Sequence, residues 1–278
     1  MTVLITGSSG GIGRSLARSL PALGWQLRGF DREPAGGDLE TICGDITDPD
    51  ALDAAMAGVR AVVHLAGQAT EAPWPVIREA NLEGCYQVFE AARRAGVRRV
   101  VYASSNHAVG FTPRPPGDCA QLPADTPPRP DTLYGVSKAF GEALARYYVD
   151  RYDMQVACLR IGTFAETPPD ARSMATWLSP ADCAQLVDTC LRTDRLGFAL
   201  VWGVSANRGR WWSLDAGQAL GYHPLDDASQ HRPESPGAVY QAADLPVGGA
   251  FTEPSFGIDE VAGRWDDAPA ARSESRSG

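Results

Sequence analysis

A glycine-rich turn between an apolar strand and a helix constrains the fold of this chain more than any other feature. Residues 3–6 have the pattern of a buried strand, and the run Thr-Gly-Ser-Ser-Gly-Gly-Ile-Gly at 6–13 leads into a helical pattern that continues to about residue 23. Glycine permits the tight turn and lets the backbone approach a pyrophosphate at the helix N-terminus. A glycine-rich turn of some other α/β protein is the alternative. The strand–turn–helix order favours a dinucleotide site formed by Gly7, Gly10, Gly11, Ile12 and Gly13.

The rest of the first half alternates strand and helix patterns. Helical spacing of apolar residues marks a helix over 75–95 and a second one that ends near residue 152, in which we expect Phe140, Leu144 and Tyr147 to be the apolar stripe. Further strands are expected at 26–30, 41–44, 59–65, 98–104 and 154–160, with a Pro/Gly-rich loop at 111–131. This order predicts an α/β fold, a Rossmann-type doubly wound parallel sheet with helices on both faces.

The pattern becomes less regular after residue 161. We expect residues 1–165 to form the nucleotide-binding domain and residues 166–266 to form a small C-terminal substrate-binding portion packed on it. Within the latter, helices are expected at 181–191 and 212–220 and a strand at 198–202. Residues 267–278 are polar and small, which predicts a disordered tail.

The residue that ends the second strand indicates which dinucleotide binds. Asp31 lies there, and a carboxylate at this place accepts hydrogen bonds from the adenosine ribose and repels a 2′-phosphate. This favours NAD over NADP as the cofactor. The strictness of that choice stays open, because the neighbouring Arg32 is able to accommodate the phosphate.

The ends of the third and fourth strands are expected to contact the same cofactor. Asp45 and Ile46 would lie at the adenine, unless Asp45 only belongs to the start of a helix before Pro49. The run His-Leu-Ala-Gly at 64–67 would place Leu65, Ala66 and Gly67 against the centre of the cofactor. We interpret His64 as a strand-end histidine with satisfied hydrogen bonds and not as a catalyst.

Tyr134 and Lys138 lie four residues apart, so on a helix they share one face. Free tyrosine has a pKa of about 10, and a fixed cation beside it lowers that pKa because it favours the phenolate. The spacing alone is common on solvated helix faces. Ser105, however, closes the fifth strand at the ligand-binding edge of the sheet, where it can hydrogen-bond a substrate oxygen while Tyr134 takes the proton.

Together, the glycine turn, Asp31, the strand-end serines and the Tyr-x-x-x-Lys pair resemble the extended short-chain dehydrogenase/reductase (NAD-dependent epimerase/dehydratase) family over residues 1–165. The resemblance implies an NAD-dependent oxidoreductase in which the tyrosine is the acid/base. It implies that Lys138 binds the nicotinamide ribose and lowers the tyrosine pKa, and that Ser105 orients the substrate. It also places Asn81 at a helix asparagine that shapes the active site. The cofactor contacts that it adds are Asn81, Tyr134, Lys138 and Ile161.

A narrower resemblance, to the bacterial uronate dehydrogenases within that family, extends to about residue 265. It rests on Ala-Ser-Ser-Asn-His-Ala-Val-Gly at 103–110, Arg-Pro-Asp-Thr-Leu-Tyr-Gly-Val-Ser-Lys at 129–138, Leu-Arg-Ile-Gly at 159–162, Arg-Ser-Met-Ala-Thr-Trp at 172–177 and Val-Trp-Gly-Val-Ser-Ala-Asn at 201–207. It implies oxidation of a sugar acid, galacturonate or glucuronate, at C1 to the aldarolactone.

The same resemblance implies which residues bind the sugar acid. The expected substrate contacts are Ser105, Asn106, His107, Tyr134, Thr163 and Arg172. An arginine at the position of Arg172 binds the substrate carboxylate in this group, and a planar guanidinium suits that role because it grips a carboxylate bidentately. Without the resemblance, Arg172 would be interpreted as an arginine of a surface loop.

Charge and composition exclude several partners. A net charge of −9 disfavours nucleic acid and anionic membranes, and no apolar run approaches the roughly 20 residues that cross a bilayer. The six cysteines lack metal-ligand spacing, so we expect no metal site and buried thiols of a reducing, cytoplasmic compartment. Helices that flank the sheet are expected to pair in a homo-oligomer.

Two other functions fit parts of the pattern. A sugar-nucleotide epimerase or dehydratase of the same superfamily would need a larger C-terminal lobe. A non-catalytic NAD(P)-binding sensor would not need the Ser–Tyr–Lys set. The choice between galacturonate and glucuronate stays open, as does the place of Trp211 and Trp212 in the core or at an interface.

Overall fold

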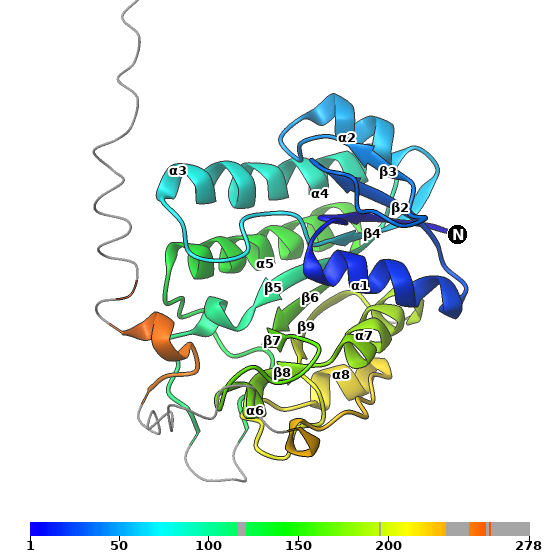
Figure 1. Ribbon diagram of the computed structural model, residues 1–278. Coiled ribbons are helices and arrows are strands. Elements are labelled where there is room, and N and C mark those ends of the chain that lie inside the picture. Colours follow the sequence, from blue (N-terminus) through cyan, green and yellow to red (C-terminus); the bar gives the residue numbers. More distant parts are fainter. Residues whose placement is uncertain (116–120, 195, 232–244, 254–255, 257–278) are drawn as a thin grey trace, which may run out of the picture.

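A seven-stranded parallel sheet is the central layer of the protein (Figure 1). The computed structural model describes residues 1–115, 121–194, 196–231, 245–253 and 256. The strand order is β3-β2-β1-β4-β5-β6-β9, so the chain reverses direction across the sheet between β1 and β4. This confirms the predicted Rossmann-type sheet. The strands are β1 (Thr2–Thr6), β2 (Gln26–Asp31), β3 (Thr41–Cys43), β4 (Val59–His64), β5 (Arg99–Ser105), β6 (Gln155–Ile161) and β9 (Phe198–Gly203).

Helices cover both faces of this sheet (Figure 1). One face carries α1 (Gly11–Ser19) and α7 (Pro180–Arg192), and the other carries α2 (Pro49–Met56), α4 (Gly84–Arg94) and α5 (Leu133–Tyr152). The predicted helix over 75–95 is continuous but changes its winding, from α3 (Trp74–Ile77) through the π-helical η2 (Arg78–Glu83) to α4. The remaining short elements are η1 (Leu20–Leu23), η3 (Asn106–Val109), α6 (Ser173–Thr176), α8 (Asp215–Leu220), η4 (Ala228–Gln230) and η6 (Gly249–Thr252).

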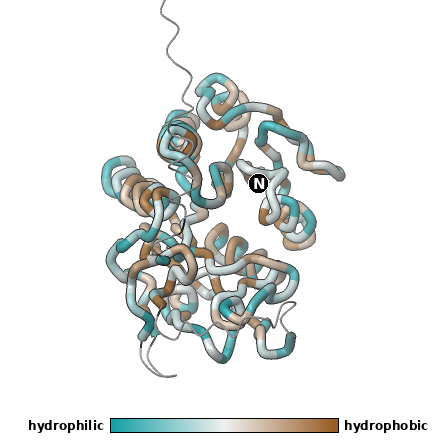
Figure 2. Tube along the Cα trace, turned by 60° about the vertical axis from the view of Figure 1, so that its left-hand side comes forward, coloured by the Kyte–Doolittle hydropathy of each residue, from teal (hydrophilic) through white to brown (hydrophobic). Residues whose placement is uncertain are grey.

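Alternating residues of the strands divide the interior into two apolar cores. Val3 and Ile5 of β1 pack in the core beneath α1 and α7, whereas Leu4 packs in the core beneath α2 and α4. The brown, hydrophobic stretches of the chain trace accordingly gather toward the middle of the molecule (Figure 2). The central strands β1, β4, β5 and β6 are buried on both faces over most of their length, as expected of a parallel sheet covered by helices.

Residues beyond 165 contribute to this sheet as well as to the surface beside it. β9 is its last strand and α7 packs on α1. The short strands β7 (Thr163–Phe164) and β8 (Trp177–Leu178) pair with each other outside the main sheet, and the sequence pattern did not predict them. The division at residue 165 stays a prediction, and the expected tail at 267–278 lies outside the described residues.

The expected apolar stripe of α5 is wrong for Phe140 and Tyr147, whereas Leu144 is half-buried and packs against the core. Phe140 and Tyr147 are 36% and 52% exposed, because α5 meets the sheet through a different face. Gly141, Ala145 and Tyr148 form that face, and a β-carbon on Gly141 would collide with the Tyr102 ring. The small residues Gly141 and Ala145 let α5 lie close to the sheet, and Phe140 and Tyr147 are left at the surface.

One cysteine also departs from expectation. Cys85, Cys158, Cys183 and Cys190 are buried, but Cys43 at the end of β3 is exposed; Cys119 lies outside the described residues. Over the described part of the chain, the helices are all too short or too polar to span a membrane.

Candidate active site

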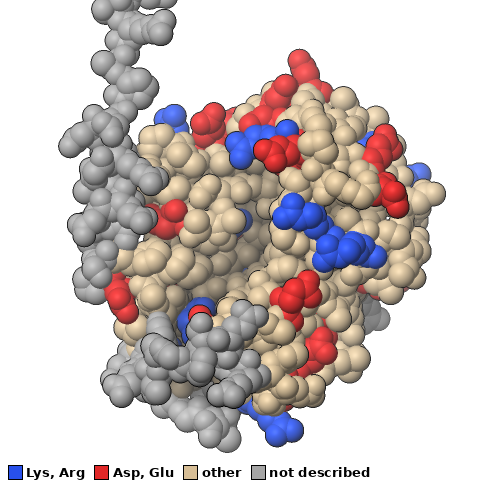
Figure 3. Space-filling model, in the orientation of Figure 1, with Lys and Arg blue, Asp and Glu red and all other residues tan. Residues whose placement is uncertain are grey.

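The glycine turn forms one wall of a cavity of about 820 Å³ at the carboxyl ends of the strands. Its volume is near the upper end of the roughly 300–1,000 Å³ of ligand pockets, and Figure 3 shows the hollow in this face of the molecule. Gly7 has φ 75°, and a β-carbon on Gly13 would collide with the carbonyl of Gly7. Both positions therefore require glycine, and the backbone amides at the start of α1 stay open to an anionic ligand.

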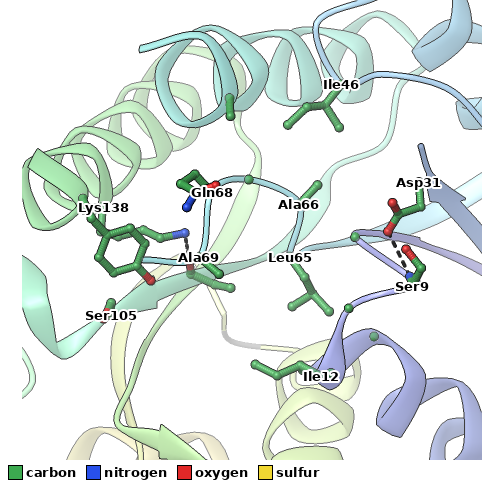
Figure 4. Close-up of a pocket in the computed structure, with 18 of the residues that line it drawn as sticks. Ser9, Ile12, Asp31, Ile46, Leu65, Ala66, Gln68, Ala69, Ser105 and Lys138 are labelled. Atoms are coloured by element: carbon green, nitrogen blue, oxygen red, sulfur yellow. Dashed lines mark hydrogen bonds between the residues drawn. The ribbon is translucent and has the colours of Figure 1, made fainter. Parts of the chain in front are cut away.

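Asp31 lies at the end of β2 beside this turn. Its Oδ2 accepts a hydrogen bond from the backbone N–H of Ser9 at 2.9 Å, and Figure 4 shows the two residues at one end of the cavity. Arg32 is exposed and lines the same end. The structure thus brings together the residues expected at the adenosine ribose.

Asp45 and Ile46, expected at the adenine, also line the cavity. Asp45 Oδ1 accepts hydrogen bonds from the N–H and the hydroxyl of Thr47, at 2.9 and 2.8 Å. The helix that begins at Pro49 has Asp48 as its N-cap. Asp45 therefore stabilises the preceding turn, and its carboxylate is not the helix cap.

The end of β4 supplies the floor of the cavity. Leu65, Ala66 and Gly67 line it as expected. His64 is buried, and its Nδ1 lies 2.8 Å from the hydroxyl of Thr6. Burial, aided by the charge of Lys138, lowers the pKa of His64 to about 3. His64 is thus a neutral histidine with a hydrogen-bond partner, as interpreted from the sequence.

Asn81 braces the loop that follows β4. In the π-helical segment, its Oδ1 accepts from the N–H of Gln68 at 2.6 Å, and its Nδ2 donates to the Gln68 carbonyl at 3.0 Å and to the Ser137 hydroxyl at 2.9 Å. These bonds connect the loop to α5. Asn81 therefore shapes the site from behind the loop.

Lys138 and Ser105 lie at the inner end of the cavity, opposite Asp31 (Figure 4), and Tyr134 lines the same cavity. The Lys138 Nζ donates to the Ala103 carbonyl at 2.9 Å and lies 5.4 Å from the centre of the Tyr134 ring. The first turn of α5 is held by two side chains, because Thr132 accepts from the N–H of Gly135 at 3.0 Å and Glu71 accepts from the N–H of Tyr134 at 2.8 Å. No pattern in the sequence predicts this role of Glu71.

The acid/base pair differs electrostatically from the expectation. Burial raises the pKa of Tyr134 to about 12, a hydrogen bond with Ser105 opposes the rise, and the charge of Asp131 adds to it. Burial also lowers the pKa of Lys138 to about 8. In the protein alone the tyrosine pKa is thus raised, mainly by burial, and the expected lowering of that pKa by Lys138 stays a prediction.

Arg172 lies against Asn106, the residue that follows Ser105, although it is far from both in sequence. With the Asn106 amide oriented so that its nitrogen donates to the Ile161 carbonyl at 3.1 Å, its oxygen accepts from Arg172 Nη2 at 3.0 Å. The same Nη2 donates to the Val247 carbonyl at 2.7 Å. Arg172 is thus a positioned side chain of this site and not a surface-loop arginine.

Three findings from known proteins can be set beside this geometry. A family model described as the NAD dependent epimerase/dehydratase family matches residues 3–178. The chain belongs to this family. It is 38% identical to the uronate dehydrogenase of Pseudomonas syringae pv. tomato, over 90% of this chain and 92% of the relative. It is 39% identical to the NAD-dependent glucose-6-phosphate dehydrogenase of Haloferax volcanii, over 82% of this chain and 94% of the relative.

A solved structure extends the likeness to three dimensions. The crystal structure of uronate dehydrogenase from Agrobacterium tumefaciens matches this chain with a TM-score of 0.80 and 37% identity, over 90% of this chain and 96% of that chain. The resemblance to uronate dehydrogenases is thereby confirmed. NAD is the cofactor of this family, and the residues expected to contact it in the glycine turn, at Asp31 and at 65–67 all line the cavity.

His107, Thr163 and Trp211 each have defined partners in the structure. His107 Nδ1 lies 2.7 Å from Asp131 Oδ2, and its ring stacks on Phe251 with centres 4.2 Å apart. Thr163 shares a 2.8 Å hydroxyl contact with Thr176. The Trp211 ring lies 5.8 Å from the Arg172 guanidinium, whereas Trp212 is buried and stacks on Trp202 at 4.6 Å.

No sequence pattern indicates the roles of Asp131 and Phe251. Asp131 lies one residue before the helix cap Thr132, within a family motif that gives it no separate role. Phe251 follows a segment without periodicity. Four and three residues before Phe251, the backbone N–H groups of Val247 and Gly248 donate to the Thr112 and Gly110 carbonyls, at 3.0 and 2.9 Å. These long-range hydrogen bonds leave no local signal in the sequence.

Proposed function

We propose that the protein is an NAD-dependent dehydrogenase that oxidises a hexuronate, galacturonate or glucuronate, at C1 to the aldarolactone, which then opens to the aldaric acid. The placement of Arg172 against Asn106, the residue after Ser105, carries this proposal. A guanidinium for a carboxylate thus lies beside an acid/base pair for a hydroxyl. The names of the similar uronate dehydrogenases support the same substrate.

The proton of the C1 hydroxyl passes to Tyr134 in this proposal. Ser105 shares the hydroxyl oxygen and orients it, since both side chains are buried at the inner end of the cavity. Lys138, positively charged and fixed on the Ala103 carbonyl, compensates the phenolate. NAD supplies the redox step when bound, by accepting the C1 hydride.

The other end of the sugar is held by polar side chains. Asn106 and His107 bind ring hydroxyls, Thr163 lies beside them, and Arg172 binds the C6 carboxylate. Fixing a sugar at both ends orients C1 toward the acid/base pair, and such orientation supplies a large part of many enzymatic rate accelerations. The cationic contact also offsets the repulsion that an acid would meet from a protein of charge −9.

A direct assay tests this function. Purified protein with NAD and either galacturonate or glucuronate should form NADH, and the absence of NADH with both would reject the proposal. Glucose 6-phosphate and L-arabinose are the matched alternative substrates, because relatives carry the names of dehydrogenases for these sugars. A sugar-nucleotide epimerase would instead convert its substrate without net NADH, and a sensor would bind NAD without turnover.

A sugar phosphate is the second candidate substrate. The relative from Haloferax volcanii is about as similar to this chain as the uronate dehydrogenases are, and a guanidinium binds phosphate as well as carboxylate. Activity with glucose 6-phosphate above that with both uronates would favour it.

We further propose a cytoplasmic homo-oligomer. Val136, Phe140 and Tyr147 of α5 and Tyr86 of α4 are exposed on neighbouring helices, and apolar side chains gathered in this way mark interaction surfaces. Light scattering of the protein should give a mass above that of one chain, and Phe140→Ser should lower it. A monomeric wild type would contradict this assembly.

A further inference from the structure

A completely buried carboxylate, that of Asp131, lies against His107, one of the residues proposed to bind the sugar acid. The side chain of Asp131 has no exposed surface. Its Oδ2 lies 2.7 Å from His107 Nδ1, and its Oδ1 accepts from the Thr132 hydroxyl at 3.1 Å. An ionised side chain is costly to bury unless it is paired and hydrogen-bonded. Its retention here therefore calls for an explanation.

The surrounding backbone makes room for this carboxylate. A β-carbon on Gly110 or on Gly248 would collide with Asp131 Oδ2, and one on Gly135 would lie 3.0 Å from Oδ1. Gly110 and Gly248 have ordinary negative φ values, so space and not conformation accounts for these glycines. Three segments of the chain are thus shaped around one side chain.

The contact with Asp131 decides the chemical form of His107. An ionised carboxylate can only accept hydrogen bonds, so the proton of the neutral imidazole lies on Nδ1. Nε2, on the far side of the ring from Asp131, then carries the lone pair. The ring plane is fixed as well, because it stacks on Phe251 at 4.2 Å and meets the Tyr134 ring edge-on at 5.9 Å.

We propose that Asp131 is a positioning residue that fixes the tautomer and the ring plane of His107, so that His107 offers an unprotonated Nε2 to a hydroxyl of the sugar. The step from His107 to the sugar rests on the proposed function. The assignment of the tautomer rests only on the contacts of Asp131.

The conservative variant Asp131→Asn should reverse the tautomer. The Thr132 hydroxyl accepts from the Gly135 N–H at 3.0 Å, so its own proton is available for an acceptor on residue 131. That proton selects the carbonyl oxygen of an asparagine. The amide NH2 then faces His107, which must accept at Nδ1 and carry its proton on Nε2. Asp125→Asn is the matched control, because it removes a charge from an exposed residue of the same loop.

Nitrogen NMR of the histidine side chains tests the assignment without any substrate. The chain has four histidines, so His107→Gln identifies the signal. We expect the Nδ1–H tautomer of His107 in the wild type and in the control Asp125→Asn, and the Nε2–H tautomer in Asp131→Asn. The His64 signal should be unchanged in all three proteins, which would show that they are folded. An Nε2–H tautomer in the wild type would overturn the proposal without any variant, and so would an unchanged tautomer in Asp131→Asn.

Kinetics test the consequence for the sugar. Asp131→Asn should lose one hydrogen bond to the bound sugar and so raise the KM for the uronate about tenfold. Its kcat and its KM for NAD should stay within about threefold of the wild type. A merely structural role would instead lower the melting temperature and impair both substrates together, which would overturn the positioning role. If the wild type oxidises neither uronate, the proposed function is rejected. The tautomer assignment is then decided by the NMR result alone, since that measurement needs no substrate.

Discussion

The cofactor side and the substrate side of the cavity are built in different ways. The cofactor side comes from the ends of β1, β2 and β4, all within the first 67 residues, and backbone hydrogen bonds of the sheet hold it. On the proposed substrate side, next to Ser105, side-chain contacts join Asn106, Asp131, Arg172 and Val247 from separate segments. Side-chain changes should therefore alter the choice of sugar more readily than they alter dinucleotide binding.

Tyr134 lies where the two sides meet, so its loss should have the largest effect. Tyr134→Phe removes the proton acceptor and should lower kcat about 10²- to 10⁴-fold, while the affinity for NAD, measured by fluorescence titration, changes little. Tyr147→Phe is the matched control, because Tyr147 lies on the exposed face of the same helix. Turnover of Tyr134→Phe at the wild-type rate would remove Tyr134 from the chemistry.

Substitution of Arg172 should have the second-largest effect, and only on the sugar. Arg172→Ala should lower kcat/KM for a uronate about a hundredfold, because two charge-assisted hydrogen bonds are lost, and should leave the KM for NAD unchanged. Arg172→Lys keeps the charge without the bidentate geometry and should fall between the two. Arg208→Ala is the control at an exposed arginine. Full activity of Arg172→Ala toward galacturonate and glucuronate would contradict the carboxylate contact.

The same difference explains what could be predicted from the sequence. The glycine turn and Asp31 were predictable because their roles follow from strand ends, and a parallel register of β1 with β2 fixes where those ends lie. Arg172 had no such signal. It reaches the site through the pairing of Thr163 with Trp177, and strands of two residues have no period, so only the resemblance to a known group identified it.

The role of Asp131 and the buried face of α5 could not be predicted from residue spacing. The aspartate precedes a helix cap, and its partner His107 lies in another element, so spacing alone gives Asp131 no role beyond the turn. On α5, the spacing of Phe140 and Tyr147 suggests a buried face, but the tight approach made possible by Gly141 buries the neighbouring face one residue along, with Ala145 and Tyr148.

The pH dependence of kcat/KM should report the Tyr134–Lys138 pair. Since the pKa of Tyr134 is about 12 and that of Lys138 about 8, the first proton leaves the pair near pH 8. The active form, phenolate beside ammonium, is a tautomer of the form that results. Its population thus rises tenfold per pH unit below about pH 8 and is level above it.

Lys138→Met provides the comparison. The variant retains only the tyrosine, so kcat/KM should be low and should keep rising well beyond pH 8 without a break. A break at the same pH in Lys138→Met, or a wild-type profile that falls as the pH rises toward 8, would show that another group governs the profile.

Asp31 should give the smallest effect and the sharpest test of the cofactor side. Asp31→Asn keeps an oxygen that can accept from the Ser9 N–H, so the turn should stay intact. It removes a charge that would lie near a 2′-phosphate, and two unit charges about 4 Å apart in water interact by about 1 kcal/mol. The preference for NAD over NADP should therefore fall about fivefold, with the KM for the uronate unchanged.

Asp31→Ala loses the contact with the glycine turn as well, so it should also weaken the binding of NAD. Arg32→Ala added to Asp31→Asn should reverse part of the gain with NADP, because the exposed guanidinium is the cation nearest in sequence to the removed carboxylate. An unchanged NAD/NADP ratio in Asp31→Asn would show that backbone geometry and not this charge selects the dinucleotide.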